Sequence, residues 1–311
     1  MTRVSAIIPV YNGAATIAEA IDSALGQTWR DLEVIVADDG STDETRAILD
    51  RYGDRIRVVT QSNRGPAAAR NAAVRIAAGE YLAFLDADDR WMPPMIERTV
   101  AVLDRDPECP LVYTNLAVVD SRGRKLAPAM IGGDLAHPPT LDEMLSRMWP
   151  IMTSGVVMRR TAFDRAGGFC EEFARASYED IHFWIVVREQ GPFRYIPEPL
   201  AVWRFSLFPG RLKQAGGNAA AGELFARLLR ERYGVSAEPL LKSRIRAPRS
   251  ILGYIGLLAM REGDAAEARQ AFAYALRIDP LRLRNYLRLL RTYLPLRIAR
   301  ALSGRTGREA G

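Results

Sequence analysis

The sequence has little cysteine and no long hydrophobic run. Its two cysteines, Cys109 and Cys170, are too few for a disulfide framework, and no C-x-x-C pair is present, so we expect a reducing compartment. The longest nearly uncharged apolar stretch, residues 250–260, is far shorter than the roughly 18–20 residues that span a bilayer. The apolar run near the N-terminus is broken by Pro9 and is too short for a signal-peptide core. These absences predict a cytoplasmic protein without transmembrane helices.

The loop after the first apolar segment lacks the glycines of two nucleotide-binding enzyme classes. Residues 9–17 read PVYNGAATI, with a single glycine. Nicotinamide-dependent dehydrogenases need G-x-G-x-x-G at this point of a similar sheet. Nucleotidyltransferases that make sugar nucleotides need a Gly-rich loop that contains arginine, which is also absent. We therefore exclude both classes.

Charge is placed unevenly along the chain. Residues 281–311 contain one acid, Glu309, and eight arginines, at positions 282, 284, 288, 291, 297, 300, 305 and 308, which gives a balance of +7. The whole chain carries +6, so the first 280 residues sum to −1. The basic character belongs to the tail. Nucleic-acid binding is not expected, because no aromatic stacking platform accompanies these arginines.

Apolar segments alternate with helix-length segments over the first 120 residues. The apolar segments are continuously hydrophobic, which is typical of strands that are covered on both faces of a sheet. They lie at 4–8, 32–37, 57–59, 81–85 and 111–119, and the helical segments lie at 14–26, 42–52, 66–78 and 93–105. This alternation predicts an α/β fold with a doubly wound, mostly parallel, Rossmann-like sheet.

The rest of the chain divides at a Gly-rich, basic segment, residues 208–218, which reads as a loop or linker. We expect residues 1–218 to form the main domain and residues 219–311 to form a helical C-terminal region. Small and aromatic residues within that region resemble one tetratricopeptide hairpin, at Gly256, Ala268, Phe272, Ala275 and Pro280. One copy cannot form a solenoid, so it either packs on the main domain or docks a partner.

Three polar clusters follow three of the predicted strands. In an open α/β sheet, ligands bind outside the carboxyl ends of the strands, so the clusters predict one shared site. Each also has a simpler interpretation: a turn at the first, a Ser41–Glu44 capping box at the second, and a solvated loop at the third. The clusters are Pro9-Val10-Tyr11-Asn12, Asp38-Asp39-Gly40-Ser41 and Asp86-Ala87-Asp88-Asp89.

The third cluster places three carboxylates within four residues. At an effective dielectric of about 20, two unit charges near 4 Å apart repel by on the order of 4 kcal/mol. A hard divalent cation bound by the carboxylate oxygens removes that cost. Such a cation, when it keeps open positions, typically also holds substrate phosphates.

The order of these motifs resembles the family 2 glycosyltransferases, inverting enzymes with the GT-A fold. The resemblance covers roughly residues 1–205. It implies that residues 1–120 hold a nucleotide-diphosphate sugar and residues 121–218 face the acceptor. The resemblance rests on five stretches of sequence. The first begins VSAIIPVYNG and continues to VIVADDGSTDET, and the others are NRGPAAARN, YLAFLDADD, GGF and YEDIHFW.

The resemblance assigns the donor site residue by residue. Pro9, Val10 and Tyr11 match the loop that cradles the base and stacks on it, and Asp39 matches the aspartate that accepts a hydrogen bond from the base. Arg70 matches a basic residue on the nucleotide, whereas its neighbour Asn71 is interpreted as a packing residue. The uracil of a UDP-sugar is the expected base.

The family's D-x-D motif matches Asp86-Ala87-Asp88. By resemblance, Asp86 lies near the ribose, with a further role on the metal left open, and Asp88 binds Mn²⁺ or Mg²⁺ on the diphosphate. The metal neutralises the charge that develops on the leaving diphosphate. Asp89 is a candidate helper.

The acceptor hydroxyl needs a base, because it is a poor nucleophile until it is deprotonated. Asp180 matches the family's base, with Glu179 as the alternative. Ser177-x-x-Asp180 also fits a helix cap, which leaves a purely structural role for Asp180 open. Residues 167–169, GGF, resemble the loop that faces the acceptor.

Two departures from the family pattern bear on the activity. Many relatives carry a histidine in a basic tract after the base helix, where this chain reads VWRFSLFPGR. Closure over the diphosphate is therefore expected from Arg204, Arg211 or Lys213. The Q-x-x-R-W motif and the transmembrane helices of processive synthases are absent, which favours the addition of a single sugar, as by a hexosyltransferase.

These patterns together predict a metal-dependent glycosyltransferase of polysaccharide or cell-surface glycan synthesis that acts on a glycan or a lipid-linked acceptor. A non-catalytic scaffold that binds nucleotide sugars is the alternative.

Leu283, Leu287, Leu290 and Leu294 recur at helical spacing beside arginines, which is typical of a basic amphipathic helix. Residues 281–311 therefore either bind an anionic surface at the inner face of the cytoplasmic membrane or pack on the main domain.

Overall fold

A computed structural model describes residues 3–127, 129–174, 176, 178–205, 219–244, 256–257, 259–260, 264–278 and 283–293. The described residues form two compact units. The first holds those up to Phe205 together with residues 219–240, and the second holds those from Leu241 onward. The sequence analysis placed 219–240 with the C-terminal region instead.

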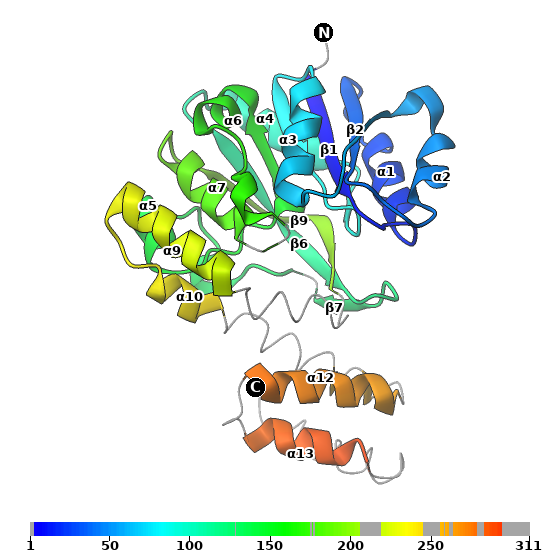
Figure 1. Ribbon diagram of the computed structural model, residues 1–311, viewed down its shortest axis with the longest axis vertical. Coiled ribbons are helices and arrows are strands. Elements are labelled where there is room, and N and C mark those ends of the chain that lie inside the picture. Colours follow the sequence, from blue (N-terminus) through cyan, green and yellow to red (C-terminus); the bar gives the residue numbers. More distant parts are fainter. Residues whose placement is uncertain are drawn as a thin grey trace. The chain divides into compact units, whose positions relative to one another are not determined.

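The N-terminal half of the first unit is a parallel sheet in the order β3-β2-β1-β4 (Figure 1). Helices connect the strands in sequence, as the alternating pattern predicted. All seven residues of β1 are buried, since both faces of the strand are covered. The bounds are β1 Val4–Val10, α1 Ile17–Leu25, β2 Leu32–Asp38, α2 Thr45–Asp50, β3 Arg57–Thr60, α3 Pro66–Ile76 and β4 Tyr81–Phe84.

The C-terminal half of the sheet mixes strand directions. β8 lies antiparallel between β4 and β6, and β9 runs parallel to β6 and antiparallel to β5. The short β7 pairs with β6. The bounds are β5 Arg90–Trp91, α4 Met95–Arg105, β6 Leu111–Val119, β7 Lys125–Ala127, α5 Leu141–Ser146, β8 Val156–Arg159, α6 Arg160–Ala166, α7 Glu179–Arg188 and β9 Arg194–Arg204.

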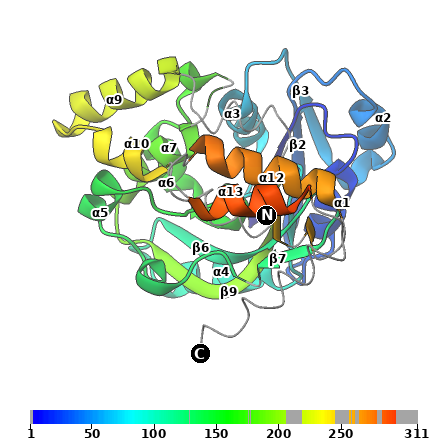
Figure 2. The ribbon, with the colours of Figure 1, turned by 90° about the horizontal axis from the view of Figure 1, so that it is seen from below.

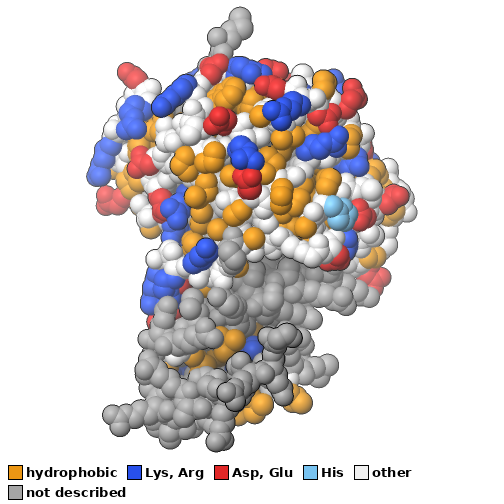
Figure 3. Space-filling model, turned by 180° about the vertical axis from the view of Figure 1, so that it is seen from behind, with side chains coloured by type: hydrophobic (Ala, Val, Ile, Leu, Met, Phe, Trp, Pro, Cys, Tyr) orange, Lys and Arg blue, Asp and Glu red, His pale blue; other side chains and the backbone are white. Residues whose placement is uncertain are grey.

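Helices cover both faces of the sheet. Figure 2 shows α3, α6 and α7 on one face and α4 on the other. Helix α1 lies beside α4, because the Gln27 side chain accepts a hydrogen bond from the Ile96 backbone N–H at 3.0 Å. On the outer surface, acidic and basic side chains of the first unit are interspersed (Figure 3), in keeping with the near-zero charge of the first 280 residues.

Two helices begin later than the sequence pattern predicted, because the loops before them are tied together. The backbone N–H groups of Gly13 and Ala14 donate to the Thr45 hydroxyl at 2.9 Å and to Asp43 at 3.1 Å. These contacts hold residues 12–14 outside α1. The predicted Ser41–Glu44 capping box is wrong: the Ser41 hydroxyl accepts from the Asn12 N–H, and no side chain caps α2.

Helix α9 contacts both ends of α7. In α9 (Ala219–Tyr233), Phe225 stacks on Tyr178 with ring centroids 5.1 Å apart. Arg232 of α9 forms an ion pair with Glu189 at 2.6 Å. The next helix, α10, spans Glu238–Arg244.

The second unit contains α12 (Ala265–Ile278) and α13 (Leu283–Arg291). Ala259, Ala268 and Phe272 form its small core. A Cβ added at Gly256 would lie 2.6 Å from the Phe272 ring, so only glycine allows this close approach. Pro280, the last residue of the tetratricopeptide-like pattern, lies outside the described residues. Across the described parts of both units, no helix is long and apolar enough to cross a bilayer.

Candidate active site

The carboxyl ends of β1, β2 and β4 bring the three predicted clusters to one edge of the sheet. Val10 pairs with Asp38 in the register of β1 and β2, and the Leu85 N–H donates to the Ile7 carbonyl at 3.0 Å just beyond β4. A Cβ placed on Gly13 would lie 3.8 Å from that of Ala87, so the first and third clusters are neighbours.

The loop after β1 presents an aromatic side chain to solvent. Tyr11 is 49% exposed, and the residue after it, Asn12, has a φ of 52°. The Asn12 side chain accepts a hydrogen bond from the Thr42 N–H at 2.7 Å, which stabilises this unusual backbone. Pro9 and Val10 lie in the last part of the buried strand β1. Tyr11 is therefore free to stack on a planar ligand.

The carboxylate after β2 organises the loop before α3. Asp39 is buried and accepts from the Gln61 side chain at 2.8 Å, from the Arg64 N–H at 2.8 Å and from the Gly65 N–H at 2.7 Å. A carboxylate has about four acceptor sites, so one remains for a ligand. The loop contacts hold that carboxylate at the edge of the sheet.

The D-x-D cluster is a tight turn. The Asp89 N–H donates to the Asp86 carbonyl at 3.0 Å, which closes the turn around Ala87 and Asp88. The Asp89 side chain points inward, where it accepts from the Ser154 hydroxyl at 2.5 Å and from the Arg204 N–H at 2.8 Å. Burial, together with the neighbouring Asp88 and Asp86 carboxylates, raises the pKa of Asp89 well above its usual value. Asp89 thus supports the turn, while Asp86 and Asp88 lie nearer the surface.

A buried arginine compensates the acids of the turn. Arg70 is 4% exposed, and its guanidinium donates to Asp86 at 2.7 Å and to Glu179 at 3.2 Å. The sequence analysis assigned Arg70 to the nucleotide. In the structure its two terminal nitrogens point instead at carboxylates of this chain, and a positive charge already lies among the acids.

Sequence reasoning missed the role of the next residue. Asn71 was interpreted as a packing residue, but its side chain donates to the Phe169 carbonyl at 2.9 Å and accepts from the Phe169 N–H at 3.0 Å. It also donates to Glu171 at 3.0 Å. Gly168, which precedes Phe169, has a φ of 78°, which suits glycine. Asn71 therefore fixes the loop that precedes α7.

The two candidate base residues open helix α7. Tyr178, at the N-cap position, has a φ of 93° and no side-chain capping bond, while Ser177 lies outside the described residues. Glu179 is buried, and this burial, with the adjacent Asp180 carboxylate, raises its pKa to about 7 although Arg70 lowers it. Asp180 is partly exposed, and its carboxylate accepts from the Ile181 N–H at 2.8 Å. Asp180 is thus the more accessible of the two acids.

Arg204, at the end of β9, contacts the D-x-D turn and stabilises it. Its Nε donates to the Asp88 carbonyl at 3.0 Å, and another nitrogen forms an ion pair with Glu19 of α1. The other two cations considered for closure over a diphosphate, Arg211 and Lys213, lie outside the described residues.

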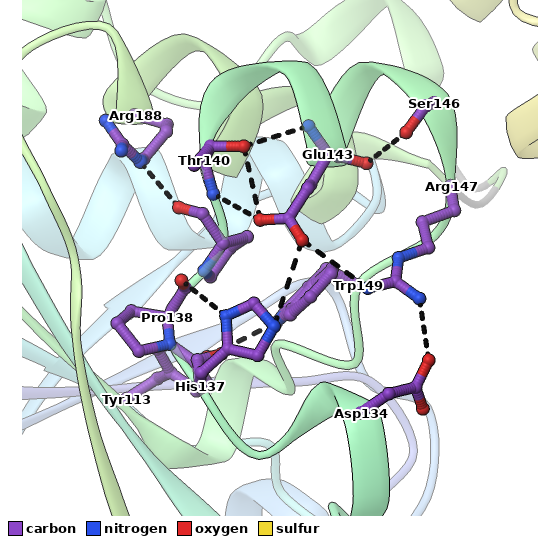
Figure 4. Close-up of polar contacts among 11 residues, drawn as sticks. Tyr113, Asp134, His137, Pro138, Thr140, Glu143, Ser146, Arg147, Trp149 and Arg188 are labelled. Atoms are coloured by element: carbon purple, nitrogen blue, oxygen red, sulfur yellow. Dashed lines mark hydrogen bonds and ion pairs between the residues drawn. The ribbon is translucent and has the colours of Figure 1, made fainter.

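The segment between β7 and β8 is held by a polar and aromatic cluster (Figure 4). Glu143 lies 3.8 Å from His137 and 3.5 Å from Arg147. The Arg147 guanidinium lies 4.6 Å from the centre of the Trp149 ring, and the Trp149 N–H donates to the Tyr113 hydroxyl at 3.3 Å. These contacts hold the stretch between β7 and β8 in place. They use none of the candidate site residues.

The donor set fits a dication bridged by substrate. Among the described residues, no group of three or more acidic, histidine or cysteine side chains could enclose a metal. Asp89 is turned inward and Asp86 is paired with Arg70, whereas Asp88 is partly exposed on the turn, which makes Asp88 the candidate ligand. A dication that takes one or two carboxylates and completes its shell with phosphate oxygens needs no enclosed cluster.

Comparison with known proteins connects this arrangement to a family. Residues 5–167 match the family described as Glycosyl transferase family 2. An uncharacterised glycosyltransferase of Rickettsia conorii is 32% identical over 238 residues, which cover 74% of this chain and 38% of that protein. The chondroitin synthase of Escherichia coli is 32% identical over 196 residues, covering 62% of this chain and 27% of that protein. The chain thus spans well under half the length of these relatives.

Solved structures share the fold. TarS 1–349 of S. aureus in complex with UDP has a TM-score of 0.55 and 18% identity, covering 98% of this chain and 92% of that chain. The mannosyltransferase PcManGT of Pyrobaculum calidifontis, in complex with GDP-Man and Mn²⁺, has a TM-score of 0.54 and 23% identity, covering 99% and 88%. The predicted GT-A fold with a helical C-terminal part is confirmed. With more than half of its length matched by the family model, the chain belongs to glycosyl transferase family 2.

Proposed function

We propose that the protein is an inverting glycosyltransferase that moves one sugar from a nucleotide-diphosphate sugar to an acceptor hydroxyl. One observation carries the proposal: Arg70 joins the Asp86 turn to Glu179, so the partly exposed Asp180 at the start of α7 lies beside the donor-side turn. A metal-binding carboxylate and a base are thereby held at one edge of the sheet, as a transfer between two substrates requires.

The donor we propose is a UDP-sugar. Tyr11 provides an exposed ring for stacking, and Asp39 has an acceptor site left for the imide N–H of the base. Pro9 and Val10, which precede Tyr11, are buried at the end of β1 and complete the proposed base-binding segment. Structures of TarS with UDP and with UDP-GlcNAc, and of PcManGT with GDP-Man, support nucleotide sugars as the donor class.

Mn²⁺ or Mg²⁺ is the proposed cofactor, with Asp88 as its main ligand and Asp86 as a further candidate. When bound, the metal supplies positive charge to the leaving diphosphate. The Mn²⁺ in the PcManGT complex supports this assignment. Arg204 holds the Asp88 carbonyl, which keeps the turn in one conformation.

The chemistry needs one base and no covalent intermediate. Asp180 accepts the proton of the acceptor hydroxyl while its oxygen attacks the anomeric carbon from the face opposite the diphosphate. The bond between that carbon and the diphosphate oxygen breaks, and the nucleoside diphosphate leaves with the bonding electrons. Attack from the opposite face inverts the anomeric configuration. Glu179 is the alternative base, but its burial and its bond to Arg70 favour Asp180.

The proposed acceptor is a glycan or a lipid-linked sugar of a cell-surface polysaccharide. The matched relatives include a chondroitin synthase, which supports a glycan acceptor. The Gly167–Phe169 loop and α7 carry the residues that would face it. A scaffold that binds nucleotide sugars without transferring them is the alternative. The retained Asp88 and Asp180 favour catalysis over it.

We also propose that α13 binds an anionic membrane surface, which would present a lipid-linked acceptor. Within the second unit, Leu283, Leu287 and Leu290 are 76%, 59% and 64% exposed, and Tyr293 is 67% exposed. Arg288 and Arg291 directly follow Leu287 and Leu290 in the same helix, so they lie beside the leucines. The exposed leucines would contact the acyl chains of an anionic lipid surface, and the arginines beside them would contact its headgroups.

Nucleotide release tests the function. UDP-GlcNAc, UDP-glucose and GDP-mannose are incubated with Mn²⁺ and a glycan extract, and the released nucleotide is measured for the wild type and for Asp180→Asn. Loss of a general base typically lowers the rate by about 10²–10⁴. We expect release from at least one donor and a loss of this size in the variant. Nucleotide binding without release from any donor would instead support the scaffold.

A further inference from the structure

We propose that Arg70 is a positioning residue, which fixes the start of α7 against the Asp86 turn and does not bind the nucleotide. The inference rests on the proposed function, because Asp180 is the base only there. It departs from what the resemblance implied for Arg70, and its grounds are the contacts of the buried guanidinium.

Each terminal nitrogen of the Arg70 guanidinium donates a hydrogen bond to one carboxylate. One donates to Asp86 at 2.7 Å and the other to Glu179 at 3.2 Å. Both contacts are ion pairs, and the side chains of Arg70 and Glu179 are 5% and 10% exposed. A planar fork can hold two carboxylates at a fixed separation, which a lysine ammonium cannot do. Arg70 therefore sets the distance between the turn and the first residue of α7.

The same turn of α3 also holds the loop before α7. The Arg70 guanidinium carbon lies 5.3 Å from the centre of the Phe169 ring. Asn71 bonds to both the N–H and the carbonyl of Phe169. Two consecutive residues of α3, Arg70 and Asn71, thus contact three segments that are distant in sequence. These are the Asp86 turn, the Gly167–Phe169 loop and the start of α7.

A nucleotide could reach this guanidinium only by displacing a carboxylate. Arg70 is 4% exposed, and its Nε has no hydrogen-bond acceptor among the described residues. Nε is buried as well. The protein atoms that surround it offer no acceptor, and they also keep a ligand away from it. Removing the guanidinium would leave two acids without their counter-charge, and breaking a buried pair in this way is strongly unfavourable.

Positioning and nucleotide binding predict different kinetics. A residue that contacts the nucleotide contributes to its affinity with or without the chemical step. A residue that positions the base contributes to turnover at saturating donor, because a misplacement of about 1 Å costs on the order of 10²-fold in rate. The split between nucleotide affinity and turnover therefore distinguishes the two roles.

The experiment compares Arg70→Met, Arg70→Lys, Glu179→Gln and the control Arg160→Met in the full chain. Arg160, the first residue of α6, is a partly buried arginine whose guanidinium donates to the Val74 and Gly79 carbonyls at 3.1 and 3.2 Å, near the C-terminal end of α3. UDP affinity is measured by calorimetry without metal. Turnover is measured as nucleotide release from the donor with the highest wild-type rate. Amide hydrogen exchange is followed in peptides that cover residues 164–184.

For Arg70→Met we expect a UDP dissociation constant within about 3-fold of the wild type and turnover lower by about 10²-fold. Amide exchange should rise in the peptides around Phe169 and Glu179. Arg70→Lys should retain an intermediate rate, since it keeps the charge without the fork. Arg160→Met should change neither turnover nor exchange in these peptides. Adding Glu179→Gln to Arg70→Met should cost little more, because the two residues act as one unit.

A UDP affinity more than about 10-fold weaker in Arg70→Met, with turnover unchanged at saturating donor, would overturn the proposal. If Arg70→Met does not fold, Glu179→Gln decides, since it keeps the guanidinium: wild-type turnover in that variant would also overturn it. Failure of the proposed function has a different signature. The wild type would then bind UDP and release no nucleotide, or bind no UDP.

Discussion

At the scale of single residues, the ionisable side chains buried at this site each have a specific compensating partner. Arg70 is balanced by Asp86 and Glu179, and Asp89 by the Ser154 hydroxyl and the Arg204 N–H. A buried charge without such a partner would cost several kcal/mol. The motif order located these residues, but it could not separate those that meet substrate from those that hold them. That distinction depends on which neighbour from a distant segment reaches each side chain.

His182, on the base helix, shows the opposite arrangement. It packs on Phe173, and its Nδ1 has no hydrogen-bond partner in the part of the chain that the structure describes. Burial, and then the positive Arg232, lower the pKa of His182 to about 4, while Glu189 raises it. The folded protein therefore binds this proton less readily than the unfolded chain, whose histidine titrates near its usual value of about 6.5.

The first prediction follows from this difference. Between about pH 6.5 and 4 the unfolded state binds more protons at His182, so the contribution to stability is complete above pH 6.5 and is lost as the pH falls through this window. His182→Phe should remove that loss. We expect its free energy of unfolding, relative to the wild type, to rise by about 3 kcal/mol from pH 7 to pH 4 in urea titrations. A pH-independent difference would contradict the assignment.

At the scale of elements, α3 organises the site, and the sequence predicted its span of 66–78 closely against the observed Pro66–Ile76. All five predicted strands of the first 120 residues are also present, because continuous apolar runs of this length are typical of buried strands. The starts of α1 and α2 were predicted too early. Their first turns are replaced by side chain–backbone bonds between two loops, and such long-range pairs leave no periodic signal.

The second prediction concerns the loop before α7. A Cβ added at Gly168 would lie 2.9 Å from the Asn71 Oδ1, whereas one added at Gly167 meets nothing within 4 Å. Both glycines have positive φ, near 80°. Gly167→Ala should therefore cost only the backbone strain, about 1–2 kcal/mol. Gly168→Ala should cost more and should also lower turnover, because it displaces Asn71.

Urea unfolding of the two variants and their nucleotide release provide the comparison. Equal losses of stability, with equal turnover, would mean that Asn71 does not hold the loop.

At the scale of the whole molecule, residues 1–280 are nearly neutral and the basic charge lies in residues 281–311. The charge of the tail was plain from the sequence, but the exposure of the leucines was not. Within the second unit, Ala259, Ala268 and Phe272 form the core, and Leu287 and Leu290 of α13 lie outside it and are exposed.

The third prediction tests this surface in the full chain. Leu287→Glu with Leu290→Glu should abolish flotation on vesicles that contain anionic lipid, since it replaces apolar contact with like charge. The wild type should float with these vesicles, float less at high salt, and not float with zwitterionic ones. The control is a charge change at a partly exposed residue of α12, Glu267→Gln. Equal flotation of the wild type and the double variant would exclude α13 as the membrane contact.

The central claim is that the D-x-D turn holds a dication that holds a diphosphate. A crystal structure of the protein with UDP and Mn²⁺, with the manganese located by its anomalous signal, tests it most directly. We expect a manganese peak between the Asp88 carboxylate and the diphosphate, with the uracil at Tyr11 and Asp39 and the Arg70 guanidinium still on Asp86 and Glu179. A bound UDP with no manganese at Asp88, or with its diphosphate away from the turn, would contradict it.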